Sequence, residues 1–201
     1  MKVKAYHGSD HKITKFSDEF AGAINAVDAE GPGIYFTNSL ENSEMWGKFT
    51  YTVYLNPRKV ISNIKPASRA SRKDMKKFLD MISDEDYVNN WSPNIEMDKR
   101  MAIDAAIEYS STEYEAWHSL RSEQYNGAPQ QFMRAMSKLG YDATLLYKKD
   151  FKFNDVDKTY HYIVYNPEIV EIITAERNRN VEEVRKIIRN VLDETFPSNI
   201  S

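Results

Sequence analysis

The sequence of 201 residues contains no cysteine, so it carries no disulfide framework. Its N-terminus has no apolar signal segment, and no run of 18 apolar residues occurs, so we expect a cytoplasmic protein without a membrane span. The net charge of −3 argues against a dominant electrostatic attraction to nucleic acid, although it leaves room for a local basic patch.

Several catalytic motifs are also absent. The sequence has no HExxH pair and no other paired metal-ligand spacing, so no metal site is expected. It has neither a GxxxxGK[ST] phosphate loop nor a G-x-S-x-G serine elbow, which excludes the corresponding P-loop and hydrolase sites. With 41% hydrophobic and 28% charged residues, the composition is that of a soluble globular protein, and we interpret residues 1–201 as one domain.

Strand patterns occupy both ends of the chain and helical patterns the middle. Residues 68–139 are expected to be mostly helical, with a cap at Ser71, a Thr112–Glu115 capping box and a stop at Gly140. This insert also offers Trp91 and Trp117 as candidate exposed aromatics. The pattern of residues 180–196 predicts a terminal helix. Strands at the ends with segregated helices indicate an α+β fold. The expected strands are "KVKAYHG", "GIYFTNS", "FTYTVYLNPRKVI", "YDATLLYKK" and "YHYIVYNPEIVEII".

Two short segments carry the residues with chemical potential. In the first, "YHGS", His7 lies at a strand end and Gly8 permits a ligand to approach the backbone closely. In the second, "GPGIYFTNSLENSEMWG", Tyr35 is followed by Ser43 eight residues later and by Trp46 three residues beyond that. A helical turn would place Ser43 and Trp46 on one face. Taken singly, each of these residues is more often structural than functional.

Taken in order, "YHGS", "GPGIYFTNSLENSEMWG" and the late "YIVYNPEIV" resemble the ADP-ribosyltransferase catalytic domain of the diphtheria-toxin and poly(ADP-ribose) polymerase type. The sequence is most similar to the small transferases of phages and mobile elements, found in polyvalent proteins. The resemblance covers about residues 3–55 and 137–173. It implies a split β-sheet with a helical insertion and a C-terminal helix, and a location in the host cytoplasm if a phage encodes the chain.

The resemblance also assigns roles. It implies that His7 hydrogen-bonds a ribose hydroxyl of NAD and that the Gly8 backbone binds the nicotinamide carboxamide, with Ser9 in the same NAD-binding segment. Tyr35 would stack on the nicotinamide ring. Ser43 matches the family's serine, and Trp46 replaces its usual second tyrosine. Cleaving the bond between nicotinamide and ribose develops positive charge on the sugar, which the site has to stabilise.

The sequence departs from the family at one catalytic position. The residue before "YIVY" is His161, so the triad reads His7, Tyr35, His161 in place of His, Tyr, Glu. A neutral imidazole can accept a hydrogen bond but supplies no negative charge. Three possibilities stay open: a transferase that uses His161 as a hydrogen-bonding substitute, one that recruits an acid such as Asp155 or Asp157, and an inactive NAD-binding relic.

The expected activity is mono-ADP-ribosylation of a macromolecular acceptor, with NAD as co-substrate, release of nicotinamide and no metal. A protein acceptor is expected, and a nucleic-acid base remains an open alternative that depends on residues 149–158. Two other functions remain open as well. One is a catalytically weak or inactive NAD-binding or interaction protein, and the other is an NAD glycohydrolase.

Overall fold

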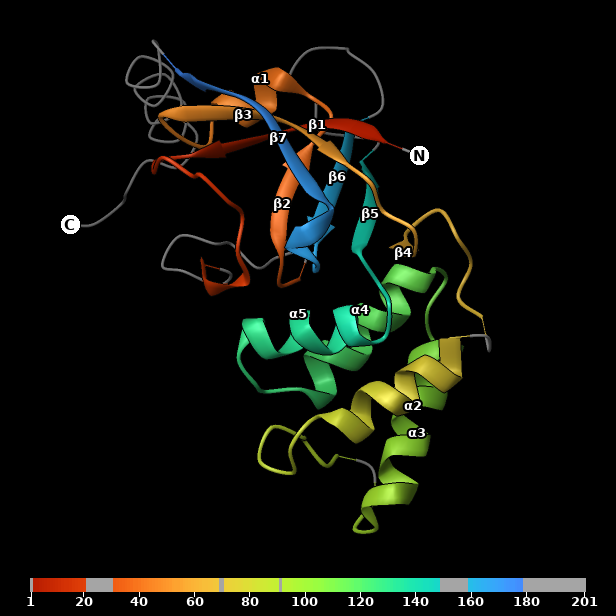
Figure 1. The fold of residues 1–201 in the computed structure, drawn as a ribbon. Helices are drawn as coiled ribbons and strands as arrows, with labels where there is room; N and C mark the ends of the chain where they lie inside the picture. Colours follow the sequence, from red (N-terminus) through yellow and green to blue (C-terminus); the bar gives the residue numbers. More distant parts are fainter. Residues whose placement is uncertain (1, 21–30, 69–70, 91, 149–158, 179–201) are drawn as a thin grey trace, which may run out of the picture.

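A computed structural model describes residues 2–20, 31–68, 71–90, 92–148 and 159–178. Within these ranges, seven strands form one mixed sheet in the order β4-β5-β6-β2-β1-β3-β7 (Figure 1). Neighbouring strands are antiparallel except β4 and β5, which are parallel. The strands are β1 (Val3–Ser9), β2 (Ile34–Thr37), β3 (Phe49–Leu55), β4 (Val60–Ser62), β5 (Ala143–Lys148), β6 (Thr159–Val164) and β7 (Val170–Arg177).

The shortest strand pairing of the sheet is the join between β1 and β2, at its centre. In the described part of the chain, β1 and β2 share the single registered pair Tyr6–Thr37. In contrast, β1 and β3 stay paired from Val3 to Ser9, and β2 and β6 stay paired from Ile34 to Thr37. We call the β1–β2 join the seam. It divides the sheet into a β1-β3-β7 half and a β2-β6-β5-β4 half.

Helices fill the chain between β4 and β5, as expected for residues 68–139. They are α2 (Arg72–Met81), α3 (Ile95–Glu108), α4 (Glu113–Gln124) and α5 (Pro129–Lys138). Figure 1 shows α4 and α5 beside the sheet and α2 and α3 farther from it, while the short α1 (Leu40–Glu44) lies by β1 and β3. Single turns of 3-10 helix occur at Asp18–Phe20 and Pro167–Ile169. The structure therefore has the α+β arrangement that the sequence predicts.

The helix ends follow the predicted signals with one exception. Thr112 and Glu115 form the complete capping box of α4, and Gly140 adopts a φ of 81° after α5. Ser71 does occupy the N-cap position of α2, but its side chain makes no capping bond. The reason is visible in its backbone, which is itself helical, whereas a capping residue normally has an extended conformation.

Two hydrophobic clusters lie on opposite faces of the sheet. One cluster joins Leu146 of β5, Ile163 of β6 and Tyr165, which follows β6, to buried side chains of the helices. These helical side chains include Phe78 and Met133. Trp117 belongs to this cluster with 2% of its surface exposed, so its predicted exposure is wrong. Its indole contacts the rings of Phe78 and Tyr141 edge to face, which favours burial. The other cluster gathers residues of both sheet halves: Ala5, Phe16, Phe36, Tyr51, Val53, Leu55, Ala143, Tyr162 and Val164.

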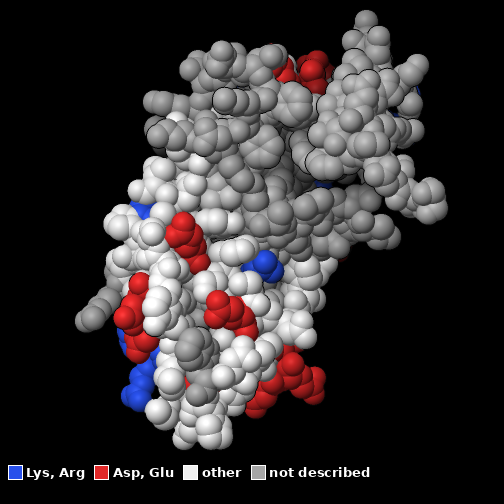
Figure 2. Space-filling view, turned by 180° about the vertical axis from the view of Figure 1, so that it is seen from behind, with Lys and Arg blue, Asp and Glu red and all other residues white. Residues whose placement is uncertain are grey.

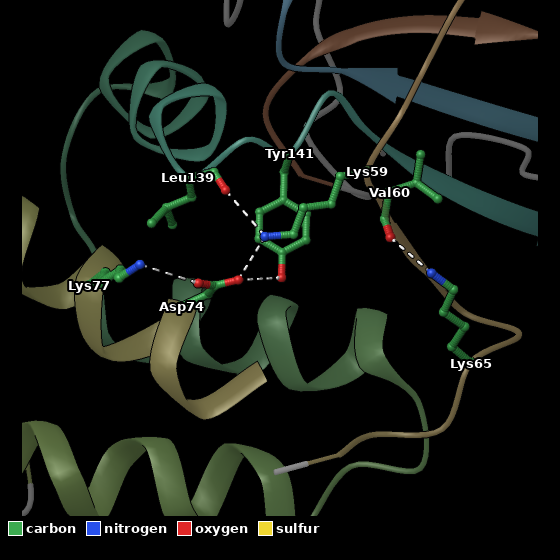
Figure 3. Close-up of polar contacts among 7 residues, drawn as sticks. All are labelled: Lys59, Val60, Lys65, Asp74, Lys77, Leu139 and Tyr141. Atoms are coloured by element: carbon green, nitrogen blue, oxygen red, sulfur yellow. Dashed lines mark hydrogen bonds and ion pairs between the residues drawn. The ribbon is translucent and has the colours of Figure 1, made fainter. Parts of the chain in front are cut away.

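A polar junction attaches the helices to the sheet (Figure 3). Lys59, just before β4, donates from Nζ to Asp74 Oδ2 of α2 at 2.7 Å and to the Leu139 carbonyl at 3.2 Å. The same ammonium lies 3.7 Å from the centre of the Tyr141 ring, and the Tyr141 hydroxyl donates to Asp74. Burial, followed by the negative charge of Asp74, raises the pKa of Tyr141. The junction thus connects the β3–β4 link, α2 and the end of α5.

Two of the expected strand segments each hold two strands. In the segment "FTYTVYLNPRKVI", the strand expected to close at Asn56-Pro57 is β3. The strand β4, which finds its parallel partner in the distant β5, was not predicted. The segment "YHYIVYNPEIVEII" is also two strands, because Asn166 and Pro167 turn the chain out of β6 and send β7 to the opposite edge, beside β3. Such non-local pairing leaves no local sequence signal. The predicted terminal helix, residues 180–196, lies outside the described residues.

Candidate functional site

His7 reaches across the seam to β2. Its Nδ1 lies 2.7 Å from the main-chain oxygen of Tyr35. Because a carbonyl only accepts, Nδ1 carries the hydrogen, and in the neutral ring Nε2 is left as an acceptor. Burial lowers the pKa of His7, against a smaller opposite effect of the Tyr35 hydrogen bond. The imidazole is therefore neutral at physiological pH, with its orientation and tautomer fixed by β2.

Aromatic rings surround the His7 imidazole. The ring centres of Phe16, Phe36 and Tyr51 lie 5.1, 5.4 and 6.2 Å from it. Phe16 comes from the segment after β1, which the Tyr51 hydroxyl anchors by accepting from the Ile13 amide at 2.5 Å. These contacts explain how a histidine is held in a partly apolar setting. They also bring in Phe16, whose polar surroundings in the sequence gave no sign of this role.

The pairing register of β1, β2 and β6 places the third motif beside the first two. Tyr6 pairs with Thr37, and Thr37 pairs with His161, so the three side chains form a row on one face of β1, β2 and β6. Tyr35 lies on the same face, two residues before Thr37. His7 follows Tyr6 and points to the opposite face, so it meets β2 at the backbone of Tyr35 and not at its ring.

Gly8 and Gly47 allow α1 to lie directly on β1. A Cβ atom added to Gly8 would lie 2.1 Å from the Ser43 carbonyl oxygen and 2.9 Å from the Trp46 Cβ. One added to Gly47 would lie 2.1 Å from the carbonyl carbon of Ser9. All three distances are shorter than real Cβ contacts, so only glycine fits at either position. Because Gly8 has no side chain, α1 can pack directly against it, which brings the first and second motifs into contact.

The side chains of the second motif differ in exposure. The Tyr35 ring is half-buried, and its hydroxyl donates to the Gly31 carbonyl at 2.5 Å, where Gly31 has a φ of 111°. Ser43 is buried and donates from Oγ to the Leu40 carbonyl at 2.6 Å. Trp46 is 67% exposed. As predicted, Ser43 lies in a short helix, α1, although that helix ends before Trp46.

The cross-strand partners of His161 carry no carboxylate. His161 pairs with Thr37 on one side and with Leu146 on the other. Glu168 and Glu171, farther along the chain, form ion pairs with Lys15 at 3.3 Å and with Lys2 at 2.6 Å. The candidate acids Asp155 and Asp157 lie outside the described residues. In the described ranges, the side chain directly before "YIVY" is therefore the imidazole of His161.

Other kinds of site were also considered. A cavity of about 310 Å³ lies between Thr14–Phe16 and the segment from Pro167 to Ile172, and none of the predicted site residues lines it. Among the described residues, no group of three or more His, Asp or Glu side chains could hold a metal ion. No helix in the described ranges is long and apolar enough to cross a membrane.

Comparisons with known proteins add little. No family model matches the sequence, and no curated protein matches it significantly. A solved structure described as "Crystal structure of an anti-CRISPR protein" matches with a TM-score of 0.40 and 14% sequence identity, covering 86% of this chain and 96% of that chain. This score is too low to establish a shared fold, and nothing about the function of this chain follows from it.

Proposed function

We propose that the protein is a mono-ADP-ribosyltransferase that transfers ADP-ribose from NAD to a macromolecular acceptor and releases nicotinamide. The observation that carries the proposal is the meeting of three distant motifs at the seam. His7 bonds the Tyr35 carbonyl, and Gly8 lies against Ser43 and Trp46. Across the β2–β6 register, His161 pairs with Thr37, two residues after Tyr35. The resemblance in sequence predicts these residues as a set, and their proximity supports the set.

The residue types are those that can recognise NAD, with His7 on one face of the sheet and the side chains of Tyr35 and His161 on the other. The neutral His7 ring offers Nε2 to accept from a ribose hydroxyl, since Nδ1 is committed to Tyr35. Tyr35 and Trp46 supply flat apolar surfaces for the nicotinamide ring, and the large exposure of Trp46 leaves its indole able to meet a ligand. Because the donors and acceptors are held by backbone contacts, little ordering is needed on binding.

In the reaction, the bond between nicotinamide and C1′ of the ribose breaks, and its electron pair leaves with nicotinamide. A nucleophilic atom of the acceptor then bonds to C1′ and loses its proton. His161 takes the place of the family's glutamate, so in this proposal it accepts a hydrogen bond from the ribose without offsetting the developing positive charge. We therefore expect slow turnover of NAD and a single transferred unit.

A protein acceptor is favoured by the charge of the visible surface. Figure 2 shows acidic side chains spread over the described part of one face, with isolated basic side chains among them. Such a face has no broad basic area to attract a polyanion. Together with the net charge of −3, this distribution supports a protein in preference to a nucleic acid.

One alternative has a specific observation in its favour. The presence of His161 at the position of the family's glutamate suits a protein that binds NAD and turns it over poorly or not at all. An NAD glycohydrolase, which uses water as the acceptor, remains the third possibility. The three functions differ in what happens to nicotinamide.

A proton NMR time course of NAD with the purified protein, run with and without a bacterial lysate, separates them. Nicotinamide that appears only with lysate supports transfer, and nicotinamide without lysate indicates hydrolysis or self-modification. NAD resonances that broaden without nicotinamide release indicate binding alone. His7→Ala is expected to abolish every effect, Tyr109→Ala serves as a surface control, and His161→Glu is expected to raise turnover. If wild type neither broadens nor consumes NAD, the proposal is wrong.

A further inference from the structure

An asparagine directly after β2 completes the pairing of that strand with β6. Thr37–His161 is the last regular pair, and the next residues in the same register are Asn38 and Tyr160. The Asn38 amide donates to the Tyr160 carbonyl at 3.1 Å, as it would in a ladder. The reciprocal bond is different: the Tyr160 amide donates to Oδ1 of the Asn38 side chain, at 2.8 Å. A side-chain carbonyl thus replaces a main-chain carbonyl.

The replacement has a local cause. Ser39, the next residue, is the N-cap of α1, and its Oγ accepts from the Asn42 amide at 3.2 Å. The main chain therefore has to leave the strand at Asn38, which would deprive the Tyr160 amide of its acceptor. The amide oxygen of asparagine has the acceptor chemistry of a peptide carbonyl, so Asn38 lets α1 begin while β6 stays bonded.

Asn38 stands at the junction of the site's components. Thr37, before it, pairs with His161, and Ser39, after it, caps the helix that carries Ser43. Its partner Tyr160 is the immediate neighbour of His161. We propose that Asn38 is a positioning residue that fixes His161 relative to β2 and α1; this role in catalysis rests on the function proposed above.

A similar side-chain clamp lies at the end of β4, which β5 and β6 separate from β2 in the sheet. Asn63, directly after β4, donates from Nδ2 to the Tyr147 carbonyl at 2.9 Å and accepts from the Tyr147 amide at 2.8 Å. Tyr147 is the cross-strand partner of Tyr160, with ring centres 5.3 Å apart. The two asparagines thus hydrogen-bond the two members of one cross-strand pair, Tyr160 and Tyr147. Of these two partners, Tyr160 is the one that directly precedes His161 in the chain.

This symmetry gives a discriminating experiment. Asn63→Ala removes the two bonds to Tyr147 at a partly buried site, whereas Asn38→Ala removes the bond from the Tyr160 amide at an exposed site. Asn63→Ala should therefore lower Tm more. If Asn38 positions His161, Asn38→Ala should nevertheless lower kcat for NAD about tenfold, while Asn63→Ala stays within about twofold of wild type. Asn38→Asp keeps the acceptor oxygen and should recover most of the lost rate.

A second readout does not require activity. The imidazole Cε1–Hε1 resonance of His161, assigned by its loss in His161→Gln, should shift in Asn38→Ala and stay in place in Asn63→Ala. The proposal is overturned if the resonance is unchanged in Asn38→Ala, or if both alanine variants shift it or slow turnover equally. If wild type neither binds nor cleaves NAD while the resonance shifts only in Asn38→Ala, the proposed function and its catalytic role fail but the structural positioning stands.

Discussion

His7 and Tyr35 are joined across the seam by one hydrogen bond, from the imidazole Nδ1 to the main-chain oxygen of Tyr35 at 2.7 Å. The bond couples a side chain of one sheet half to the backbone of the other. It fixes the tautomer of His7, and it adds a second link between β1 and β2 beside their single registered pair in the described residues. Both the stability of the seam and the chemistry of His7 depend on it.

His7→Phe tests this coupling. Phenylalanine suits the aromatic surroundings but has no donor for the Tyr35 carbonyl, so we expect a loss of about 1 kcal/mol in the free energy of unfolding and a complete loss of NAD binding. Urea titration and calorimetry measure the two effects. An unchanged affinity for NAD would show that His7 has no part in recognition.

The same residue predicts a pH dependence. Because burial lowers the pKa of folded His7, the unfolded chain takes up the proton first as the pH falls below about 6.5. Its contribution to stability is therefore complete above that pH and declines as the pH falls toward the folded pKa. His7→Phe should weaken the loss of Tm between pH 7.5 and 5.5. His118→Gln should weaken the same loss, since burial, followed by the charge of Arg121, also lowers the pKa of His118.

Gly8→Ala should displace α1 from β1. The new Cβ would lie 2.1 Å from the Ser43 carbonyl oxygen, which belongs to backbone and cannot rotate away. We expect a loss of about 2 kcal/mol in the free energy of unfolding, together with weaker NAD binding. Gly140→Ala is the control: it has open space around it and only a positive φ to strain. Equal effects on NAD binding in both variants would contradict the role of the α1–β1 contact.

Trp46→Ala should separate binding from stability. With 67% of its surface exposed, Trp46 contributes little to the core, and its removal should change the free energy of unfolding by less than about 0.5 kcal/mol. If the indole stacks on nicotinamide, affinity for NAD should fall about tenfold and recover in Trp46→Tyr. Tyr109→Ala, at an 82% exposed aromatic, is the control. An unchanged affinity in Trp46→Ala would remove Trp46 from the site.

Asp142 should control acid stability. Its side chain is 2% exposed and accepts from the Arg58 amide at 2.8 Å and from Asn166 at 3.3 Å. Burial alone would raise the pKa of Asp142, but these hydrogen bonds outweigh it and lower the pKa. Its stabilising contribution is thus complete above about pH 3.9 and lost as the pH falls through the lower folded value.

Asp142→Asn should therefore cost about 2 kcal/mol at pH 7 and flatten the dependence of stability on pH below 4. Urea titrations at pH 3 and pH 7 measure both. Asp104→Asn, at an exposed ion pair with Arg72, should change little and serves as the control. A full pH dependence retained in Asp142→Asn would assign the acid sensitivity to another group.

Local sequence patterns were sufficient to predict those features whose hydrogen bonds join residues close together in the chain. The capping box of α4 and the glycine after α5 lie within a few residues of the bonds that they make, and both were predictable. The strand β4 and the separate course of β7 depend on partners far away in the chain, so no pattern of period two could reveal them.

The site shows the same division. The order of His7, Tyr35 and His161 could be seen in the sequence, but the contact of His7 with Phe16 and the clamp of Asn38 on Tyr160 could not. Phe16 lies in a polar segment whose sequence shows no regular helical or strand pattern. Asn38 resembles an ordinary turn residue until the strand register is known, because its partner lies 122 positions away.

The seam has a further consequence for dividing the chain. The polypeptide passes from one sheet half to the other between β1 and β2, between β2 and β3, between β3 and β4, and between β6 and β7. No single cut leaves all strands of one half on one fragment and all those of the other half on the second. Co-expressed fragments could therefore rebuild the sheet only by pairing with each other, and a split version should regain its signal only when both pieces are present.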